Sequence, residues 1–337
     1  MRTTDSGRRF GFLMVPKFSL GAFSSAIEPL RLANYVSGET LYEWRTVSLD
    51  GDAVASSAGV RVAADLSIES SERLSTVFVC GGIETHLFED KRLANWLRQI
   101  ERRGTSIGAL CTGSHVLARL GLLDGYRCTI HWENLPGFVE DFPDIEVKED
   151  IFVIDRNRYT CAGGMAACDM MLSFINRHHG YELAAAVSEG LIAERIRGEE
   201  DHQRMALRLR LAVSQPKLLS GINIMSDNIE APLSQTELAS EIGLSTRQLE
   251  RLFLKYLNCT PSRYYLEMRL NRARALLQQT CMSVTNVALA TGFVSASHFS
   301  KSYRQHFGHA PRETKRLTGA ARPAWAMEDA LPASGSA

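Results

Sequence analysis

The sequence has no long apolar run, and this absence excludes a protein that spans a membrane by helices. None of its hydrophobic stretches approaches the roughly 18 residues that a transmembrane helix needs. The apolar stretch that follows two arginines near the start, FGFLMV, is only about six residues long and has no small-residue cleavage site. We expect it to form a buried first strand rather than a signal peptide, and we expect no membrane partner.

Cysteine is scarce and shows no order. Seven cysteines are scattered through 337 residues, and the chain contains no C-x-x-C pair. An odd, dispersed set fits neither a disulfide framework nor a zinc site, and it is typical of a reducing cytoplasm. We therefore expect a cytoplasmic protein with no metal and no other cofactor, in which most cysteines, namely Cys80, Cys128, Cys161 and Cys168, are core residues.

A net charge is also missing, because 38 Lys and Arg balance 38 Asp and Glu. The balance conceals an asymmetry. Residues 215–319 contain 13 Lys and Arg against 7 Asp and Glu, so this segment carries about +6 and the remainder about −6. A basic segment on a neutral chain indicates a polyanionic partner for that segment. A solvated helical face is the alternative.

The sequence does have an alternation of strand-type and helix-type patterns over about its first 180 residues. Runs of β-type residues predict strands at Phe10–Val15, Tyr42–Ser48, Thr76–Cys80 and Ser106–Leu110. Apolar residues spaced by three and four predict helices at Ala22–Tyr35, Leu87–Arg102 and Ser114–Leu120. The alternation predicts an α/β domain in which a flavodoxin-like parallel sheet is flanked by helices on both faces.

The pattern changes after this alternation. A pair of strands is predicted around Asp155–Asn157, and a helix is predicted at Met165–His178. Residues 181–213 are highly charged and predict a helical connection between domains, of which a chain of this length should have about two. The end of the chain from Ala320 is rich in Ala, Ser and Pro, and predicts a disordered tail.

An internal repeat of about 50 residues lies in the basic segment. Leu238-Ala239 and Gly243 recur 49 residues later as Val287-Ala288 and Gly292. The later positions Leu249, Arg251, Phe253 and Pro261 recur after 50 residues as Phe299, Lys301, Tyr303 and Pro311. The change of spacing places one extra residue in the turn of the second copy.

Each copy carries the signals of two short helices joined by a tight turn. Helix caps are predicted at Ser234, Ser245, Ser283 and Ser295, and turns at Gly243 and Gly292. A single unit of this kind is often part of a small helical bundle. Two in tandem, with the same caps and a basic excess, predict an all-α domain with two helix-turn-helix units.

Residues 222–317 resemble the DNA-binding domain of the AraC family of transcriptional regulators. The matching motifs are STRQLERLF in the first unit, RLNRARALL in the helix between the units and VALATGFVSASHFSKSYRQHFGHAP in the second. The resemblance implies that the recognition helices enter successive major grooves of double-stranded DNA. By motif position, the residues that face bases or phosphates are Arg247, Glu250, Arg251, Ala296, Ser297, His298 and Lys301.

The two units differ in chemistry. Arginine can read guanine through two hydrogen bonds, whereas Ala296 offers only apolar contact, for example to a thymine methyl group. We therefore expect the second unit to discriminate less by hydrogen bonds. The helix between the units should span roughly 25 Å at 1.5 Å per residue. Its arginines either contact phosphate or pair with Glu267, and these are Arg269, Arg272 and Arg274.

Cys111 stands between a predicted strand and a predicted helix, in GALCTGSHVLARLGLLDG. This position places its side chain at the carboxyl end of a parallel strand and near a helix start, which favours a thiolate or an oxyanion. His131 in CTIHWEN is a candidate base. Glu28 is an acid in a mostly apolar helix and needs a partner. The backbone N–H groups of Gly81-Gly82 are candidate oxyanion donors.

Residues 10–180 resemble the class I glutamine amidotransferase-like superfamily, in its ThiJ/PfpI branch. GALCTG matches the nucleophile elbow, CGG matches the oxyanion loop, and Glu28 matches the acid that hydrogen-bonds the cysteine. Some members use a histidine directly after the cysteine as base, but this chain has Thr112 there. His131-x-Glu133 is similar to the His-x-Glu pair of amidotransferases, although it falls early in the chain.

The two halves together resemble the GlxA-type regulators, an AraC subgroup with a ThiJ/PfpI-like sensor. FSSAIEPLRLAN, YEWRTVSLDG, CTIHWEN and CAGGMAACDMML carry this resemblance. It implies a sensor domain over residues 1–190, a helical linker over 191–221, a DNA-binding domain over 222–319 and a tail over 320–337. It also implies a homodimeric activator on the nucleoid, with RNA polymerase as a partner and a small nitrogenous effector such as a quaternary amine or an amino acid.

The expected effector site comprises Glu28, Gly82, Cys111, Thr112, His131 and Trp132. Cys111 is a buried small residue, a ligand contact without turnover or a working nucleophile. His131 is structural or part of the site, and Trp132 is core or a cation–π partner for a quaternary ammonium. We expect a ligand-responsive regulator rather than an enzyme. The alternative is a cysteine-dependent amidase, protease or glyoxal-scavenging enzyme fused to a DNA-binding domain.

Overall fold

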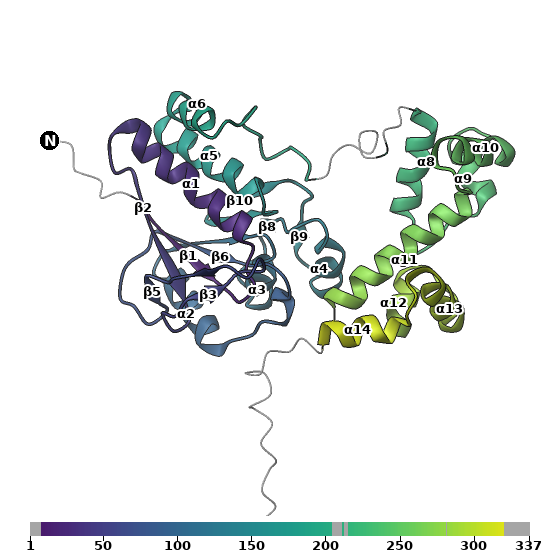
Figure 1. Cartoon of the computed structure of the whole chain (residues 1–337), viewed down its shortest axis with the longest axis horizontal. Coiled ribbons are helices and arrows are strands. Elements are labelled where there is room, and N and C mark those ends of the chain that lie inside the picture. The colour runs from purple at the N-terminus through teal and green to yellow at the C-terminus, as the bar shows by residue number, and fades with distance from the viewer. Residues whose placement is uncertain (1–7, 204–210, 212–214, 281, 320–337) are drawn as a thin grey trace, which may run out of the picture. The chain divides into compact units, whose positions relative to one another are not determined.

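The computed structural model describes residues 8–203, 211, 215–280 and 282–319, and the chain forms two compact units, residues 1–204 and 205–337 (Figure 1). The predicted disordered tail, residues 320–337, lies outside the described residues. The same is true of residues 204–210 and 212–213 of the predicted helical connection.

The first unit is built on a seven-stranded sheet in the order β10-β11-β7-β6-β1-β2-β5. The strands are β1 (Arg8–Met14), β2 (Tyr42–Ser48), β5 (Leu66–Ser67), β6 (Thr76–Cys80), β7 (Ser106–Leu110), β10 (Phe152–Asp155) and β11 (Arg158–Cys161). All neighbours are parallel except β10 and β11, which form an antiparallel edge hairpin where the strand pair was predicted. The order reverses at β1, so the connections that leave the carboxyl ends of β1 and β6 run to opposite faces of the sheet, and the crevice between them is the usual ligand position in such sheets.

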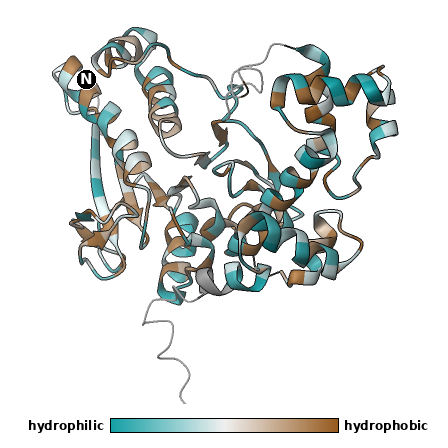
Figure 2. Ribbon diagram, turned by 45° about the vertical axis from the view of Figure 1, so that its right-hand side comes forward, coloured by the Kyte–Doolittle hydropathy of each residue, from teal (hydrophilic) through white to brown (hydrophobic). Residues whose placement is uncertain are grey.

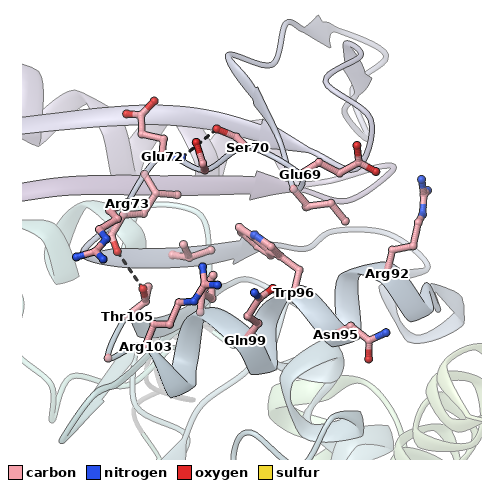
Figure 3. A pocket seen from close by; sticks show the side chains of 16 residues that line it. Glu69, Ser70, Glu72, Arg73, Arg92, Asn95, Trp96, Gln99, Arg103 and Thr105 are labelled. Carbon is pink, nitrogen blue, oxygen red and sulfur yellow. Dashed lines mark hydrogen bonds between the residues drawn. The ribbon is translucent and has the colours of Figure 1, made fainter.

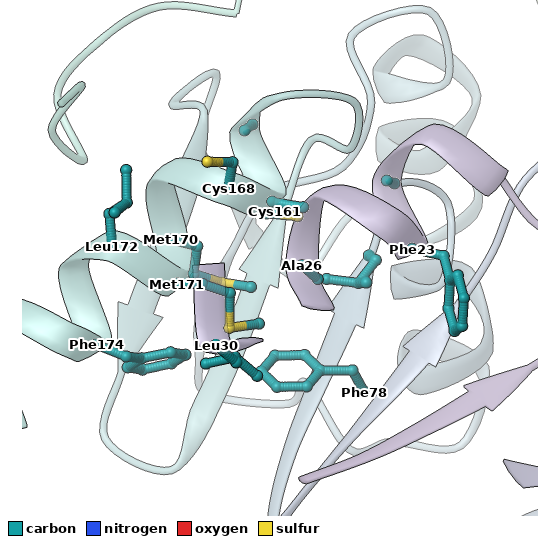
Figure 4. Close-up of a cluster of buried hydrophobic side chains, with 14 of the residues drawn as sticks. Phe23, Ala26, Leu30, Phe78, Cys161, Cys168, Met170, Met171, Leu172 and Phe174 are labelled. Atoms are coloured by element: carbon teal, nitrogen blue, oxygen red, sulfur yellow. The ribbon is translucent and has the colours of Figure 1, made fainter. Parts of the chain in front are cut away.

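Helices cover both faces of this sheet, as predicted. One face carries α1 (Leu20–Ser37), α5 (Ala166–His179) and α6 (Tyr181–Gly190), and the other carries α2 (Lys91–Arg102), α3 (Ser114–Arg119) and α4 (Leu135–Asp141). Each face of the sheet packs against its helices in a separate hydrophobic core. Successive residues of a strand point to opposite faces, so Phe12 lies in the core with α1 and α5, and Leu13 lies in the core on the opposite face. Figure 4 shows Leu30 of α1, Met171 of α5 and Phe78 of β6 meeting in the first of these cores.

The helix predicted from Leu87 begins four residues later. Asp90 caps α2, because its carboxylate accepts hydrogen bonds from the backbone N–H groups of Arg92 and Leu93. The residues before it form a short 3-10 turn, Thr85–Leu87, rather than the first turn of α2. Two short strand pairs lie outside the main sheet: β3 (Val54–Ala55) with β4 (Arg61–Val62), and β8 (Arg127–Cys128) with β9 (Glu146–Val147).

The predicted helix over 181–213 is wrong beyond α6. Residues 191–203 form turns and extended chain that pack on the first unit. The cause is a buried carboxylate in α5, because Asp169 needs a cation and Arg197 reaches it at 2.6 Å. Gln203 adds a side-chain N–H bond to the carbonyl of Ile130 at 2.9 Å. Side-chain pairing with α5 thus overrides the helical pattern of this segment.

The second unit is all helical and has two cores. Its helices are α8 (Pro216–Asp227), α9 (Gln235–Glu241), α10 (Thr246–Leu257), α11 (Pro261–Gln279), α12 (Val284–Ala290), α13 (Ala296–Phe307) and α14 (Pro311–Gly319). Side chains of α8, α9 and α10 form one core, and those of α11, α12 and α13 form the other. Figure 2 shows hydrophilic and hydrophobic residues alternating along these helices, as one-sided burial requires. Of the helices that the structure describes, none combines the length and apolar character of a membrane span.

Candidate DNA-binding surface and cysteine site

The predicted serine caps and turn glycines build both helix-turn-helix units. Ser234 and Ser245 form complete capping boxes with Glu237 and Gln248, and they start α9 and α10. Ser283 and Ser295 cap α12 and α13 in the second unit. The turn glycines have left-handed backbones, with φ of 63° at Gly243 and 73° at Gly292. A side chain at Gly292 would also collide with the carbonyl oxygen of Ile229, 2.6 Å from its Cβ position.

The second helix of each unit presents its polar face to solvent. Leu249 and Phe253 anchor α10 in one core, and Phe299 and Tyr303 anchor α13 in the other. The seven residues predicted to face DNA all lie exposed on these helices: Arg247, Glu250 and Arg251 on α10, and Ala296, Ser297, His298 and Lys301 on α13. Within the described part of the chain, no carboxylate lies within ion-pair distance of the three cations among them. Their charges are therefore available to a polyanion.

A basic residue from the preceding helix fastens each turn. The Lys217 ammonium of α8 donates to the carbonyls of Ile242 and Gly243 at 2.6 and 3.1 Å. The Arg269 guanidinium of α11 donates to the carbonyl of Thr291 at 2.7 Å and lies 4.2 Å from the Phe293 ring. In both units the cation satisfies carbonyls at the end of the first helix, where no backbone donor remains.

These contacts correct the prediction for the α11 arginines. Glu267 pairs with Arg263 at 3.0 Å, one helical turn away, and not with Arg269 or Arg274. Arg269 holds the turn, and Arg274 lies over the Phe307 ring at 5.2 Å. These two arginines therefore make contacts within the second helix-turn-helix unit.

Cys111 has the backbone of a nucleophile elbow, as predicted. It follows β7 directly, its φ is 61°, and its N–H bonds to the carbonyl of Cys161 at 3.0 Å. Two glycines make room for it. A side chain at Gly113 would lie 2.1 Å from the carbonyl oxygen of Val79, and one at Gly163 would lie 2.7 Å from Cys111 Cβ.

The thiol of Cys111 is held in its protonated form. Burial raises the pKa of Cys111 to about 11. The Thr112 N–H opposes burial with a smaller effect, and the nearby Glu133 carboxylate, with a smaller effect again, acts in the same direction as burial. The backbone N–H at the start of α3 does favour a thiolate, as expected, but burial outweighs it. At pH 7 the thiolate fraction is on the order of one in ten thousand.

The expected partners of Cys111 are engaged elsewhere. Glu28 bonds to Arg31, one turn along α1, at 3.0 Å, and this pair lowers the pKa of Glu28. The Gly82 N–H donates to the Thr85 hydroxyl at 2.8 Å, and the Gly81 N–H donates to the carbonyl of Leu110 at 3.1 Å. Neither the acid nor the two oxyanion donors expected from the sequence are thus free to serve the cysteine.

Thr112 takes the position of the family's histidine base. Its side chain is buried, and its hydroxyl donates to the carbonyl of Gly82 at 2.7 Å and lies 2.9 Å from the Thr85 hydroxyl. This bond ties the elbow to the loop after β6. A threonine held in this way has no proton-accepting role toward a thiol.

His131 and Trp132 lie at the start of the turn before α4. Among the described residues no hydrogen bond joins His131 to Cys111, and burial lowers the pKa of His131, so the ring is neutral at pH 7. Its Nδ1 is 4.0 Å from the Glu133 carboxylate. Trp132 is 37% exposed and its ring centre is 5.8 Å from that of His131. The structure thus brings Gly82, Thr112 and Glu133 to the cysteine, while Glu28 pairs with Arg31.

Comparison with known proteins agrees with both halves of this geometry. Residues 24–177 match the DJ-1/PfpI family, and residues 238–317 match a helix-turn-helix domain. The chain is 49% identical to the HTH-type transcriptional regulator GbdR of Pseudomonas aeruginosa, over 91% of this chain and 83% of that protein. It is 38% identical to the HTH-type transcriptional regulator GlxA of Rhizobium meliloti, over 93% of this chain and 97% of that protein.

The chain belongs to the AraC-type transcriptional regulators of the GlxA type. The first unit is similar to a solved AraC family transcriptional regulator from Pseudomonas putida, with a TM-score of 0.51 and 32% identity over 55% of this chain and 99% of that one. This AraC-type regulator therefore joins a DJ-1/PfpI α/β domain to a DNA-binding helix-turn-helix domain, as the sequence predicted.

A cleft of about 980 Å³ in this regulator lies away from Cys111 (Figure 3). It runs between α2 and the chain that leads from β5 to β6, and Arg73, Trp96, Gln99 and Arg103 are among its lining residues. None of the predicted effector residues lines it. In the described part of the chain no group of three or more His, Cys, Asp or Glu side chains is arranged to hold a metal ion.

Two features of the DNA-binding unit were missed from the sequence. The turn-fastening role of Lys217 has no local signal, because Lys217 lies outside the repeated segment. Val294 precedes the cap of α13 and is fully exposed. The change of repeat spacing from 49 to 50 residues indicated an extra residue in the second turn, but it did not show that this residue is Val294.

Proposed function

We propose that the protein is a ligand-responsive transcriptional activator that does not catalyse a reaction. The observation that carries this proposal is the buried Thr112 side chain, whose hydroxyl is bonded to the Gly82 carbonyl beside Cys111, in a chain with two complete helix-turn-helix units. Burial, which raises the pKa of the Cys111 thiol, acts in the same sense. An elbow without thiolate or base can still position a ligand. The exposed, unpaired cations of α10 and α13 supply the contact with promoter DNA.

The chemistry around Cys111 favours a cationic or zwitterionic effector. Glu133 is close enough to Cys111 to raise the pKa of its thiol, and the ring of Trp132 is partly exposed next to it in sequence. A carboxylate and an indole together suit a quaternary or primary ammonium group. We propose a small amine or amino acid as effector, bound by Gly82, Cys111, Thr112, His131 and Trp132, with Glu133 added and Glu28 as a peripheral member.

The remaining elements of the proposal follow from the family. AraC-type regulators with this architecture act on promoters, so we propose a cytoplasmic, nucleoid-associated homodimer that contacts RNA polymerase. Ligand binding in the α/β domain shifts the population of DNA-competent dimers.

A reporter assay with matched variants tests the effector site. The effector is first identified by thermal shift of the full-length protein with small amines and amino acids. Cys111→Ala, Cys111→Ser and Glu133→Gln are expected to reduce the response to that effector, while Arg103→Ala in the distant cleft leaves it unchanged. Loss of response only in Arg103→Ala would move the effector site to the cleft.

The enzymatic alternative has a separate readout. Purified wild-type protein is incubated with the effector, and the effector is quantified by mass spectrometry. The proposal predicts an unchanged amount of effector. Turnover by the wild type that Cys111→Ala abolishes would overturn the non-catalytic assignment.

A further inference from the structure

The two helix-turn-helix turns are the same structure with one residue inserted in the second. In the first, the N–H of Leu244 bonds to the carbonyl of Ala239 at 2.8 Å, and the next residue, Ser245, caps α10. In the second, the N–H of Phe293 bonds to the carbonyl of Ala288 at 2.8 Å, but the cap, Ser295, comes two residues later. The inserted residue is therefore Val294.

The insertion carries its side chain completely outward. Leu244 packs against the first core and Phe293 is only 2% exposed in the second, so both turns keep their inward anchor. Val294 is 100% exposed. It contributes nothing to the packing of its own unit, although it is a branched aliphatic residue in a position where solvent favours a polar one.

The surroundings of Val294 form the leading end of a recognition helix. Ser295, Ala296, Ser297 and His298 follow it and are all exposed. In helix-turn-helix proteins the first residues of the second helix approach the base edges in the major groove. At equivalent positions the first unit has Ser245, Thr246 and Arg247, and the second has Ser295, Ala296 and Ser297, preceded by the inserted Val294. The second unit thus has a serine in place of the arginine, and it adds two exposed aliphatic side chains, Val294 and Ala296.

We propose that Val294 is a specificity-determining residue that contacts the C5-methyl group of a thymine in the operator. The thymine methyl is the one apolar group that base pairs present in the major groove. Val294 and Ala296 flank the cap of α13, and both are exposed aliphatic residues. This inference rests on the proposed DNA-binding function and assigns one element of its sequence preference.

Replacing thymine by deoxyuridine tests this contact, because it removes the methyl group and keeps base pairing intact. A preferred operator is selected from random duplexes with the full-length protein. Each thymine in it is then replaced singly, and binding is measured for the wild type and for Val294→Ala, Val294→Ser and Leu289→Ala. Leu289 is the matched control, since it is an exposed aliphatic residue on α12 of the same unit.

The expected result is a coupling between one thymine position and Val294. For the wild type, deoxyuridine at that position weakens binding about fourfold, the factor for one methyl group removed from apolar contact. The same replacement has no effect on either Val294 variant and keeps its full effect on Leu289→Ala. Equal sensitivity of the wild type and the Val294 variants at every thymine would overturn the inference.

Two further outcomes separate this inference from the proposed function. Variants at Val294 that bind DNA as the wild type does but fail to activate transcription would show that the side chain meets a protein, which overturns the inference alone. Failure of the full-length protein to enrich any sequence would overturn the proposed function, and the inference with it.

Discussion

Cys111 occupies an elbow whose geometry suits a nucleophile, yet two opposing effects act on its thiol. The end of a helix typically contributes about 0.3–1 kcal/mol to a nearby charge, and α3 is only six residues long. Raising the pKa of a thiol to about 11 corresponds to ~3 kcal/mol. Burial therefore outweighs the helix terminus, and Glu133 adds to burial.

This balance predicts slow, strongly pH-dependent alkylation of Cys111. Because a raised pKa keeps the thiol protonated at neutral pH, the thiolate fraction grows as pH rises toward about 11. The rate of reaction with iodoacetamide should increase about tenfold for each pH unit between pH 7 and 10. Peptide mass spectrometry of the folded protein measures it, and a rate that levels off below pH 8 would contradict the account.

Single residues also mark the limit of what the sequence could predict at the cysteine site. The elbow followed from Cys111, Gly113 and the strand before them, because glycine is required where backbones approach closely. The role of Glu28 did not follow, since a local partner, Arg31, was available one turn away. The sequence did not show that the Gly82 N–H donates to the Thr85 hydroxyl instead of remaining available to an oxyanion. That bond depends on where Thr85 lies in the fold, which sequence spacing does not determine.

At the scale of elements, the two turn-fastening cations explain how the short helices α9 and α12 are held in place against the longer helices α8 and α11. Helices α9 and α12 have seven residues each, too few to be stable alone. Lys217 and Arg269 bond the carbonyls at their ends and connect them to the longer helices α8 and α11. Each helix-turn-helix unit is thus held by the hydrogen bonds of one cation as well as by its core.

Replacement of Arg269 should therefore destabilise the second helix-turn-helix unit. Arg269→Met keeps most of the aliphatic stem and removes the bond to Thr291, which should lower the free energy of unfolding by about 1–2 kcal/mol. Arg263→Met on the same helix breaks only the exposed pair with Glu267 and should cost less than about 0.5 kcal/mol. Urea unfolding followed by circular dichroism compares them, and equal losses would count against the turn-fastening role.

The elements themselves were predictable where local signals agreed. Strands β2, β6 and β7 begin and end as predicted, because β-type runs are bounded by turn residues, and all four serine caps are present. The helix predicted beyond α6 was wrong because Arg197 is drawn to the buried Asp169, a contact between residues 28 positions apart. Local helical pattern carries no information on such a distant partner.

At the scale of the whole molecule, the charge asymmetry and the repeat both mark residues 215–319 as the part of the chain that binds DNA. The segment that contains both recognition helices has few acidic residues and therefore an excess of basic ones, and α11, with 19 residues, separates the two helix-turn-helix units. At 1.5 Å per residue this helix is about 28 Å long, close to the ~34 Å of one DNA turn. A connecting helix of this length is compatible with recognition helices that enter successive major grooves of the duplex.

Both helix-turn-helix units are expected to contact DNA together, and a hydroxyl-radical footprint on the selected operator measures this. We expect two protected segments about 10 base pairs apart for each protomer. Arg251→Ala should weaken the protection of one segment, and Lys301→Ala that of the other. Each variant should bind DNA with a weaker salt dependence than the wild type, because it releases fewer counterions. A single protected segment that is insensitive to one of the two variants, or protection without sequence preference, would contradict this expectation.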